Sequence, residues 1–162
     1  MKWIDIEQLD SLTQSAKGAP RKRMNYNLHP TSDDAVQRLF NAIEPDTYIR
    51  PHRHSDPSSF EVFLIIRGSA VLLFFNDEGR VLERKVVSAG GETIGVEIPA
   101  NTWHAMASLE SGTIFFEVKK GPYVRPGGRN VAGWAPEEND PEAVKFVKWY
   151  CHAKTGDAPP KI

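Results

Sequence analysis

The strongest constraint on the fold is a series of short apolar runs separated by turn residues in the middle of the chain. Four runs have the length of a strand: 71–75, 81–88, 93–99 and 113–118. Turn sequences lie between them, Asn-Asp-Glu-Gly at 76–79 and Ala-Gly-Gly at 89–91. Several short strands at this spacing predict a sandwich or a closed barrel rather than a parallel sheet.

Both ends of the chain carry helical patterns instead. Asp5, with Gln8 three residues later, has the form of a capping box, so residues 1–20 are predicted to hold a helix. Its apolar positions recur at helical spacing: Ile6, Leu9, Leu12 and Ala16.

A second helical pattern follows Asp140 and a proline. Its positions are Val144, Val147, Lys148 and Cys151, and Phe146, Trp149 and Tyr150 widen the apolar face. Residues 121–162 are therefore expected to be an extended segment and a helix that packs on the barrel or on a second subunit.

Composition excludes several classes of protein. The 162 residues fit one domain, and a formal net charge of −1 lacks the basic footprint of nucleic-acid binders. No apolar run approaches the ~20 residues that span a bilayer, and the first residues lack an apolar signal-peptide core, so we expect a cytoplasmic protein with no membrane partner. The single cysteine, Cys151, excludes a cysteine-based metal site. Exposed barrel strands and an apolar-faced terminal helix favour a homodimer.

The residues with the clearest chemistry are histidines. His52 and His54 are two positions apart, so in an extended strand they project from one face. Glu61 begins a strongly apolar run, where an inward carboxylate is costly unless it is paired or metal-bound. His104 follows a predicted turn. This donor set suits one divalent transition metal ion, with Fe, Mn, Ni, Zn and Co all compatible.

The same residues resemble the two motifs of the cupin superfamily, His-x-His…Glu…Gly and Pro-x-Gly-x-x-His. His52, His54 and Glu61, closed by Gly68, match the first motif, and Pro99 with His104 matches the second. The resemblance implies an all-β core, a single jelly-roll barrel over residues 21–120, in which three histidines and one glutamate bind the metal. The chain departs from the motifs at four places: Asp46 and Asn101 replace glycines, Ser108 replaces an asparagine, and the His54–Glu61 spacing is longer than usual.

Over nearly its full length the chain also resembles a narrower group, the WbuC-type cupin-fold metalloproteins. Four segments carry this resemblance: 21–29, 37–45, 116–123 and 133–138. It implies a metal-binding cupin associated with bacterial surface-polysaccharide (O-antigen) metabolism. It does not supply a reaction.

A second polar face is predicted on the strand near residues 21–29. Polar residues occupy the odd positions: Arg21, Arg23, Asn25, Asn27 and His29. This face is either simply solvated or lines the mouth of a pocket. In the second case Arg23, Asn25 and Asn27 bind a polar substrate such as a sugar or small acid, and His29 is an acid–base candidate.

Three more residues are candidates because of their position relative to the metal ligands. Arg50 alternates with His52 and is predicted to be catalytic, and Tyr48 extends that row as a substrate-binding residue. Phe63 shares a face with Glu61 and forms either pocket wall or plain barrel core.

Three functions remain open from the sequence. The first is a metalloenzyme, an isomerase or epimerase or a dioxygenase, acting on a small polar substrate. The second is a binding or sensing module without turnover. The third is a protein whose metal is structural. Fold alone does not choose among them.

Overall fold

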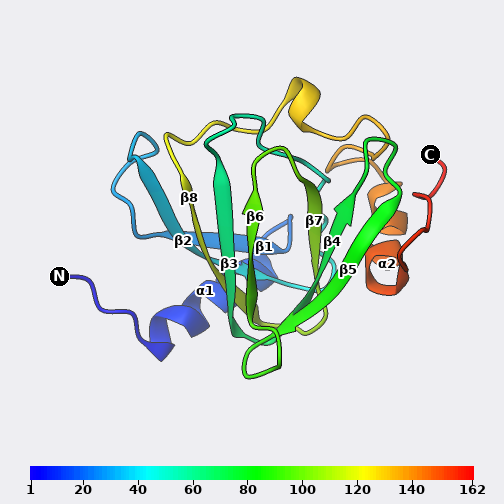
Figure 1. Ribbon diagram of the computed structural model, residues 1–162. Helices are drawn as coiled ribbons and strands as arrows, with labels where there is room; N and C mark the ends of the chain where they lie inside the picture. Colours follow the sequence, from blue (N-terminus) through cyan, green and yellow to red (C-terminus); the bar gives the residue numbers. More distant parts are fainter.

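The computed structural model describes residues 1–162 and consists of two antiparallel sheets with one helix against the outer face of each (Figure 1). The five-stranded sheet has the order β1-β2-β8-β3-β6, and the three-stranded sheet the order β5-β4-β7. The strands are β1 Arg23–Asn27, β2 Val36–Ile43, β3 Phe60–Arg67, β4 Ser69–Phe75, β5 Val81–Ser88, β6 Gly95–Pro99, β7 Trp103–Ser108 and β8 Thr113–Lys120. The helices are α1 Ile6–Gly18, the short 3-10 helix η1 Gly128–Asn130, and α2 Ala143–His152.

The predicted all-β core with a helix at each end is confirmed as a jelly-roll barrel. The predicted strand at 81–88 coincides with β5, and the runs at 71–75, 93–99 and 113–118 fall on β4, β6 and β8. The interior between the two sheets is filled by one apolar cluster: Ile43, Phe63, Ile65, Ala70, Leu72, Val87, Ile98, Met106 and Phe115.

The strand β4 explains why its run is apolar at every position. Ala70 and Leu72 face the barrel interior, whereas Val71 and Leu73 belong to a second cluster that includes Phe146 of α2. A strand that is covered on both faces has no polar face to alternate with. The run is apolar at every position because α2 covers the outer face of this sheet.

The helix α1 begins as the capping box predicts. The Asp5 carboxylate accepts a hydrogen bond from the Gln8 backbone N–H at 2.9 Å. The buried residues Leu9, Leu12 and Ala16 pack against Phe40, Ala42 and Ile114 on the outer face of the larger sheet. Ile6 is 65% exposed, so the apolar stripe starts one turn later than predicted, where the helix reaches the sheet.

The apolar face of α2 is centred differently from the prediction. Ala143, Phe146 and Tyr150 are buried, and Val147 and Cys151 pack at the edge of their cluster, whereas Val144 is 58% exposed. The helix turns its aromatic rings toward the sheet because they bury more apolar area than Val144 would. The helix also begins at Ala143, and Asp140 caps the preceding turn by accepting the Glu142 N–H at 2.8 Å.

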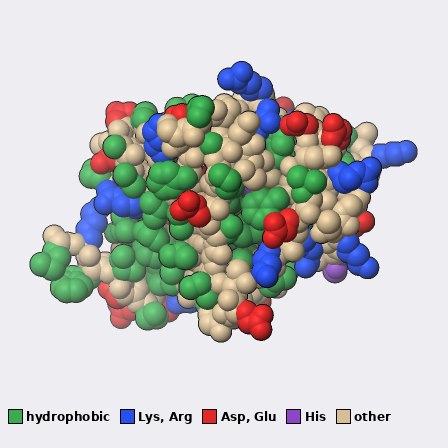
Figure 2. Space-filling model, in the orientation of Figure 1, with side chains coloured by type: hydrophobic (Ala, Val, Ile, Leu, Met, Phe, Trp, Pro, Cys, Tyr) green, Lys and Arg blue, Asp and Glu red, His purple; other side chains and the backbone are tan.

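The outer face of the larger sheet is only partly covered. Figure 2 shows apolar side chains gathered over β8 and β3 on the face seen there. The exposed apolar side chains of β3 are Phe60, Leu64 and Ile66. No helix of the structure has both the length and the apolar character needed to cross a bilayer.

Candidate metal centre

Four predicted ligands from three parts of the chain meet at one end of the barrel. His52 and His54 lie on the extended segment before β3, Glu61 lies on β3, and His104 lies on β7. One donor atom from each residue falls within 4.8 Å of all the others. The segment of His52 was predicted to be a strand, but it forms only one isolated bridge to β7. His52 N donates to His104 O at 3.1 Å, and His104 N donates to His52 O at 3.0 Å.

Backbone carbonyls fix the orientation of two imidazoles. Nδ1 of His52 lies 3.0 Å from Arg50 O, and Nδ1 of His104 lies 2.9 Å from Thr102 O. A carbonyl can only accept, so each Nδ1 carries the proton and each Nε2 presents a lone pair to the centre. Metal-binding histidines are held in this way by their other nitrogen.

The carboxylate of Glu61 completes the centre. It is 3% exposed, with Oε1 3.1 Å from His54 Nε2 and Oε2 3.0 Å from His104 Nε2. These close approaches lack hydrogen-bond geometry, and His54 Nε2, His104 Nε2 and Glu61 Oε2 are buried without a partner. A cation among them would satisfy every one of these atoms, so the donor set fits a divalent metal ion.

The electrostatics also suit a metal. Burial lowers the pKa of His52 to about 3, and the nearby His104 acts in the same direction, so the imidazole is neutral and can act as a ligand. Burial opposes ionisation of Glu61, but His104, His54 and Lys119 together hold the pKa of its carboxyl well below the usual value. Both side chains are in the protonation state that metal binding requires.

Two departures from the cupin motifs are accommodated locally. Asn101 adopts a positive φ of 62°, as the missing glycine would, and its N–H donates to His54 O at 2.7 Å. In the longer loop before Glu61, the Asp56 carboxylate accepts the Ser58 N–H at 2.9 Å and pairs with Lys120 at 2.9 Å. The loop closes on itself, so Glu61 still reaches the centre.

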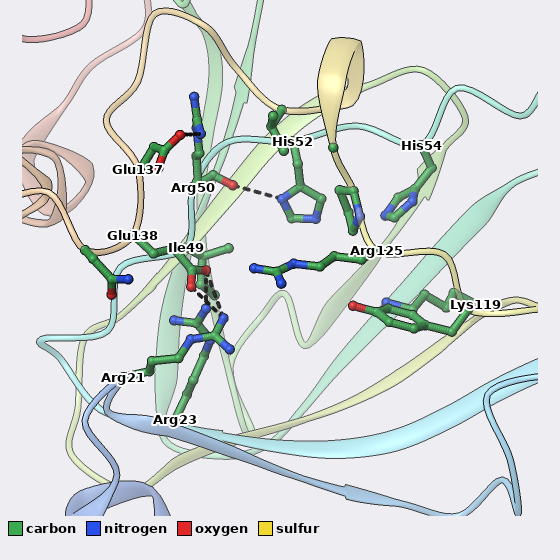
Figure 3. A pocket seen from close by; sticks show the side chains of 15 residues that line it. Arg21, Arg23, Ile49, Arg50, His52, His54, Lys119, Arg125, Glu137 and Glu138 are labelled. Atoms are coloured by element: carbon green, nitrogen blue, oxygen red, sulfur yellow. Dashed lines mark hydrogen bonds and ion pairs between the residues drawn. The ribbon is translucent and has the colours of Figure 1, made fainter.

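A cavity of about 500 Å³ opens beside His52 and His54 (Figure 3). Its charged lining consists of five cationic side chains, Arg21, Arg23, Arg50, Lys119 and Arg125, and two carboxylates, Glu137 and Glu138. The excess of positive charge favours an anionic ligand.

Two further hollows adjoin this cavity. One of about 860 Å³ runs along the polar face of β1 and shares Arg21, Arg23, Lys119 and Tyr123 with the first. A smaller one of about 140 Å³ lies inside the barrel, lined by Glu61, His104 and Phe63 among others, and it also contains Arg23 and Lys119. Arg23 and Lys119 therefore stand where all three spaces meet.

Most of the predicted substrate-site residues line these hollows. Arg50 lines the first cavity, Phe63 lines the smallest, and Asn25, Asn27 and His29 line the largest. His29 is not among the residues beside His52. Its Nδ1 accepts the Arg38 N–H at 3.0 Å, which leaves Nε2 as its remaining nitrogen.

The structure corrects the expected position of Tyr48. Residues 47–50 are not in a strand, so alternation does not carry Tyr48 into the row of Arg50 and His52. Its ring is buried in the cluster beneath α2 and stacks on Tyr150, and its hydroxyl donates to Pro136 O at 2.9 Å. It lines none of these three hollows, but it lines a fourth of about 260 Å³ together with Arg21, Arg23 and Glu138.

Sequence reasoning missed five charged residues. Lys119 places Nζ 3.4 Å from Glu61 Oε1 and also pairs with Glu117. The other three, Arg125, Glu137 and Glu138, come from the segment after β8. A signal existed for two of them, because Glu117 and Lys119 alternate with Phe115 on the inward face of an apolar strand. No local pattern marks Glu138 or Arg125.

Comparison with solved structures defines the class. The chain is similar to the conserved SPY1581 protein of unknown function from Streptococcus pyogenes, with 19% identity, a TM-score of 0.51, and coverage of 76% of this chain and 90% of that one. It is similar to TT1209 from Thermus thermophilus, with 17% identity, a TM-score of 0.51, and coverage of 74% and 97%. A cupin superfamily protein, DSY2733 from Desulfitobacterium hafniense DCB-2, matches with 15% identity, a TM-score of 0.50, and coverage of 67% and 86%. The fold is that of a cupin.

The particular family follows from the sequence. The chain belongs to the family described as a domain of unknown function, DUF6016, whose model matches residues 4–87. That span includes His52, His54 and Glu61 but ends before His104. No curated protein matches the chain.

Proposed function

We propose that this chain is a metal-dependent enzyme that acts on a small anionic carbohydrate, such as a sugar acid. The observation that carries the proposal is the cationic cavity beside the four-residue ligand set. A metal held by three histidines and a glutamate supplies Lewis acidity, or O2 binding if it is iron. The arginines supply the recognition of an anion.

The side chains around the cavity have separate parts in this proposal. The Arg50 guanidinium donates to Ala132 O from Nε at 3.2 Å and from Nη2 at 2.8 Å. Because these bonds already fix the guanidinium, Arg50 can orient a substrate without losing further side-chain freedom. The Lys119 ammonium lies 3.4 Å from Oε1 of Glu61 and helps to hold this carboxylate in place. Phe63 walls the inner end and keeps water from it.

The polar face of β1 extends the site. Asn25 and Asn27 carry amide groups that donate to and accept from sugar hydroxyls, and both line the largest hollow. His29 remains our acid–base candidate for that hollow through its Nε2. Arg23 joins this hollow to the metal centre, so one ligand can contact both.

We assign the chain to the WbuC-type cupins and its substrate to bacterial surface-polysaccharide metabolism on the sequence resemblance alone. The second candidate is a module that binds or senses the same ligand without turnover. The ordered cationic cavity supports both candidates, and the fold does not separate them. Product formation from a bound sugar acid separates them.

We also propose a homodimer. The exposed apolar side chains Phe60, Leu64 and Ile66 of β3 support it, since clustered exposed apolar side chains mark association surfaces. Sedimentation velocity at micromolar concentration should give twice the 18.2 kDa mass of one chain. A Leu64→Glu variant should give a monomer, and a monomeric wild type would contradict the proposal.

The metal dependence of the proposed function is tested by the metal content of the native protein. Native protein, purified without added metal or chelator, should hold close to one transition-metal ion per chain by elemental mass spectrometry. A His52→Ala/His104→Ala double variant should hold none. Iron would direct the search for turnover to oxygen uptake on sugar acids, and manganese, nickel or zinc to isomerisation. A wild type that is metal-free and takes up no metal on reconstitution would overturn the proposal.

A further inference from the structure

The cavity beside His52 and His54 already holds a carboxylate that belongs to the protein. Arg21 Nη2 lies 2.9 Å from Oε1 and 2.8 Å from Oε2 of Glu138, and Arg23 pairs with the same Oε1. Figure 3 shows this group at one side of the cavity, with His52 and His54 across from it. The two arginines thus form a carboxylate site that is filled from within.

Two arginines of the cavity, Arg23 and Arg50, are held in place without Glu138. Arg23 Nη1 donates to Tyr48 O at 2.8 Å, which fixes its guanidinium from behind. Arg50 is fixed by Ala132 O in the same manner and approaches Glu137 only to 3.8 Å. Arg125 makes no ion pair, and its guanidinium reaches into the middle of the cavity (Figure 3).

Releasing Glu138 requires only its side chain to rotate. The backbone around it is tied down, with Tyr48 Oη donating to Pro136 O and Asp140 N donating to Glu137 O at 3.1 Å. The Glu138 side chain is 30% exposed, that of Arg21 is 56% exposed and that of Arg23 is 19% exposed. The exposed pair with Arg21 contributes little net free energy. The carboxylate of an incoming anion would restore the less exposed pair with Arg23, so such an anion can replace Glu138.

We propose that Glu138 is an internal stand-in for the substrate carboxylate. A small carboxylate ligand binds by displacing Glu138 from Arg21 and Arg23, with Arg125 contacting it from the cavity side, and the rest of the ligand extends toward His52 and His54. This deepens the proposed function, on which it rests for the identity of the ligand as a sugar acid. The competition with Glu138 itself needs only an anion.

The test is isothermal titration calorimetry of the full chain with D-glucuronate, D-glucose and inorganic phosphate. Three proteins are compared: wild type, Glu138→Gln, and a control, Glu83→Gln. The control removes the same charge from an exposed residue of β5 that makes no ion pair. Glu138→Gln keeps the size of the side chain but weakens its hold on the arginines.

The expected result is a dissociation constant for D-glucuronate about fivefold lower in Glu138→Gln than in wild type, because a site that is occupied internally for most of the time has a reduced apparent affinity. Glu83→Gln should match wild type, and D-glucose, which lacks the carboxylate, should bind none of the three detectably. If D-glucuronate binds wild type, equal or weaker binding by Glu138→Gln would overturn the inference, as would binding of no anion by any variant.

Two outcomes separate this inference from the proposed function. If D-glucuronate fails to bind but phosphate binds more tightly to Glu138→Gln, the anion site and its competition with Glu138 stand, whereas the sugar-acid assignment falls. If elemental mass spectrometry finds no metal in protein that still shows the Glu138→Gln effect, the metalloenzyme falls and the internal stand-in remains.

Discussion

The two ends of the barrel interior differ sharply although the same two strands, β3 and β8, line both. At one end Ile65 lies opposite Phe115, and at the other Glu61 lies opposite Lys119, with Phe63 opposite Glu117 between them. Phe115 at the first end packs against the ring of Phe63 at an ordinary core distance, with the ring centroids 5.2 Å apart. The second end gathers charge and donor atoms. One end of the barrel maintains the fold, and the other is available for chemistry.

The largest expected effect is a loss of stability from a substitution at the apolar end. Phe115→Ala removes a ring that is buried against Phe63 and leaves a cavity, so we expect a loss of about 3–5 kcal/mol in the free energy of unfolding. Urea unfolding of metal-free protein measures it. A loss below about 1 kcal/mol would mean that this end is not the main source of stability.

The next largest effect is a loss of metal affinity from a substitution at the polar end that leaves the fold intact. His104→Ala removes one of the four ligands, and metal affinity should fall by more than about 100-fold, since loss of an outer-sphere partner alone costs about 10–100-fold. Competition with a chelator of known affinity gives the ratio. His152→Ala on α2, outside the ligand set, is the control and should retain metal.

A smaller effect tests whether the charges of the polar end depend on one another. Lys119→Met removes the ammonium that stands between Glu61 and Glu117, both of which are buried, and should cost about 2 kcal/mol of unfolding free energy in metal-free protein. Lys120→Met is a matched control, since its partner Asp56 is exposed. Equal losses for the two variants would show that Lys119 has no special role.

The smallest expected effect comes from a change in α1, which lies outside both ends of the barrel interior. Asp5→Ala deletes the cap of α1 and should cost about 1 kcal/mol, with metal content unchanged. Thermal unfolding and elemental mass spectrometry check both parts. A loss of metal in this variant would show that α1, unlike the core, is coupled to the centre.

How far the sequence predicts this molecule depends on the range of each interaction. The cap at Asp5, the turn at Asn101 and the strands β4 and β5 follow from neighbours within a few residues, and each was predictable. The four metal ligands were predictable because two motifs mark them, and the structure brings their donor atoms together.

Sequence reasoning failed where the partner is remote. Arg21 and Glu138 are separated by 117 positions, and no periodicity relates them. The position of Tyr48 was misjudged because alternation was extended into residues that form no strand. The centre of the buried face of α2 was misjudged because packing against the three-stranded sheet, which is remote in sequence, decides that Phe146 is buried and Val144 is exposed.

The segment that carries His52 is held on both sides by parts of the chain that are synthesised later. His52 bridges to His104 on one side and to Val131 on the other, with Ala132 N donating to Pro51 O at 2.9 Å and Arg53 N donating to Asn130 O at 3.0 Å. The last ligand leaves the ribosome with His104, yet the segment carrying His52 gains its second neighbour only when residues 130–132 emerge. A nascent chain that stops between those points has every donor atom and lacks part of the frame that aligns them, so we expect the ligand set to be fully aligned only after residues 130–132 have emerged.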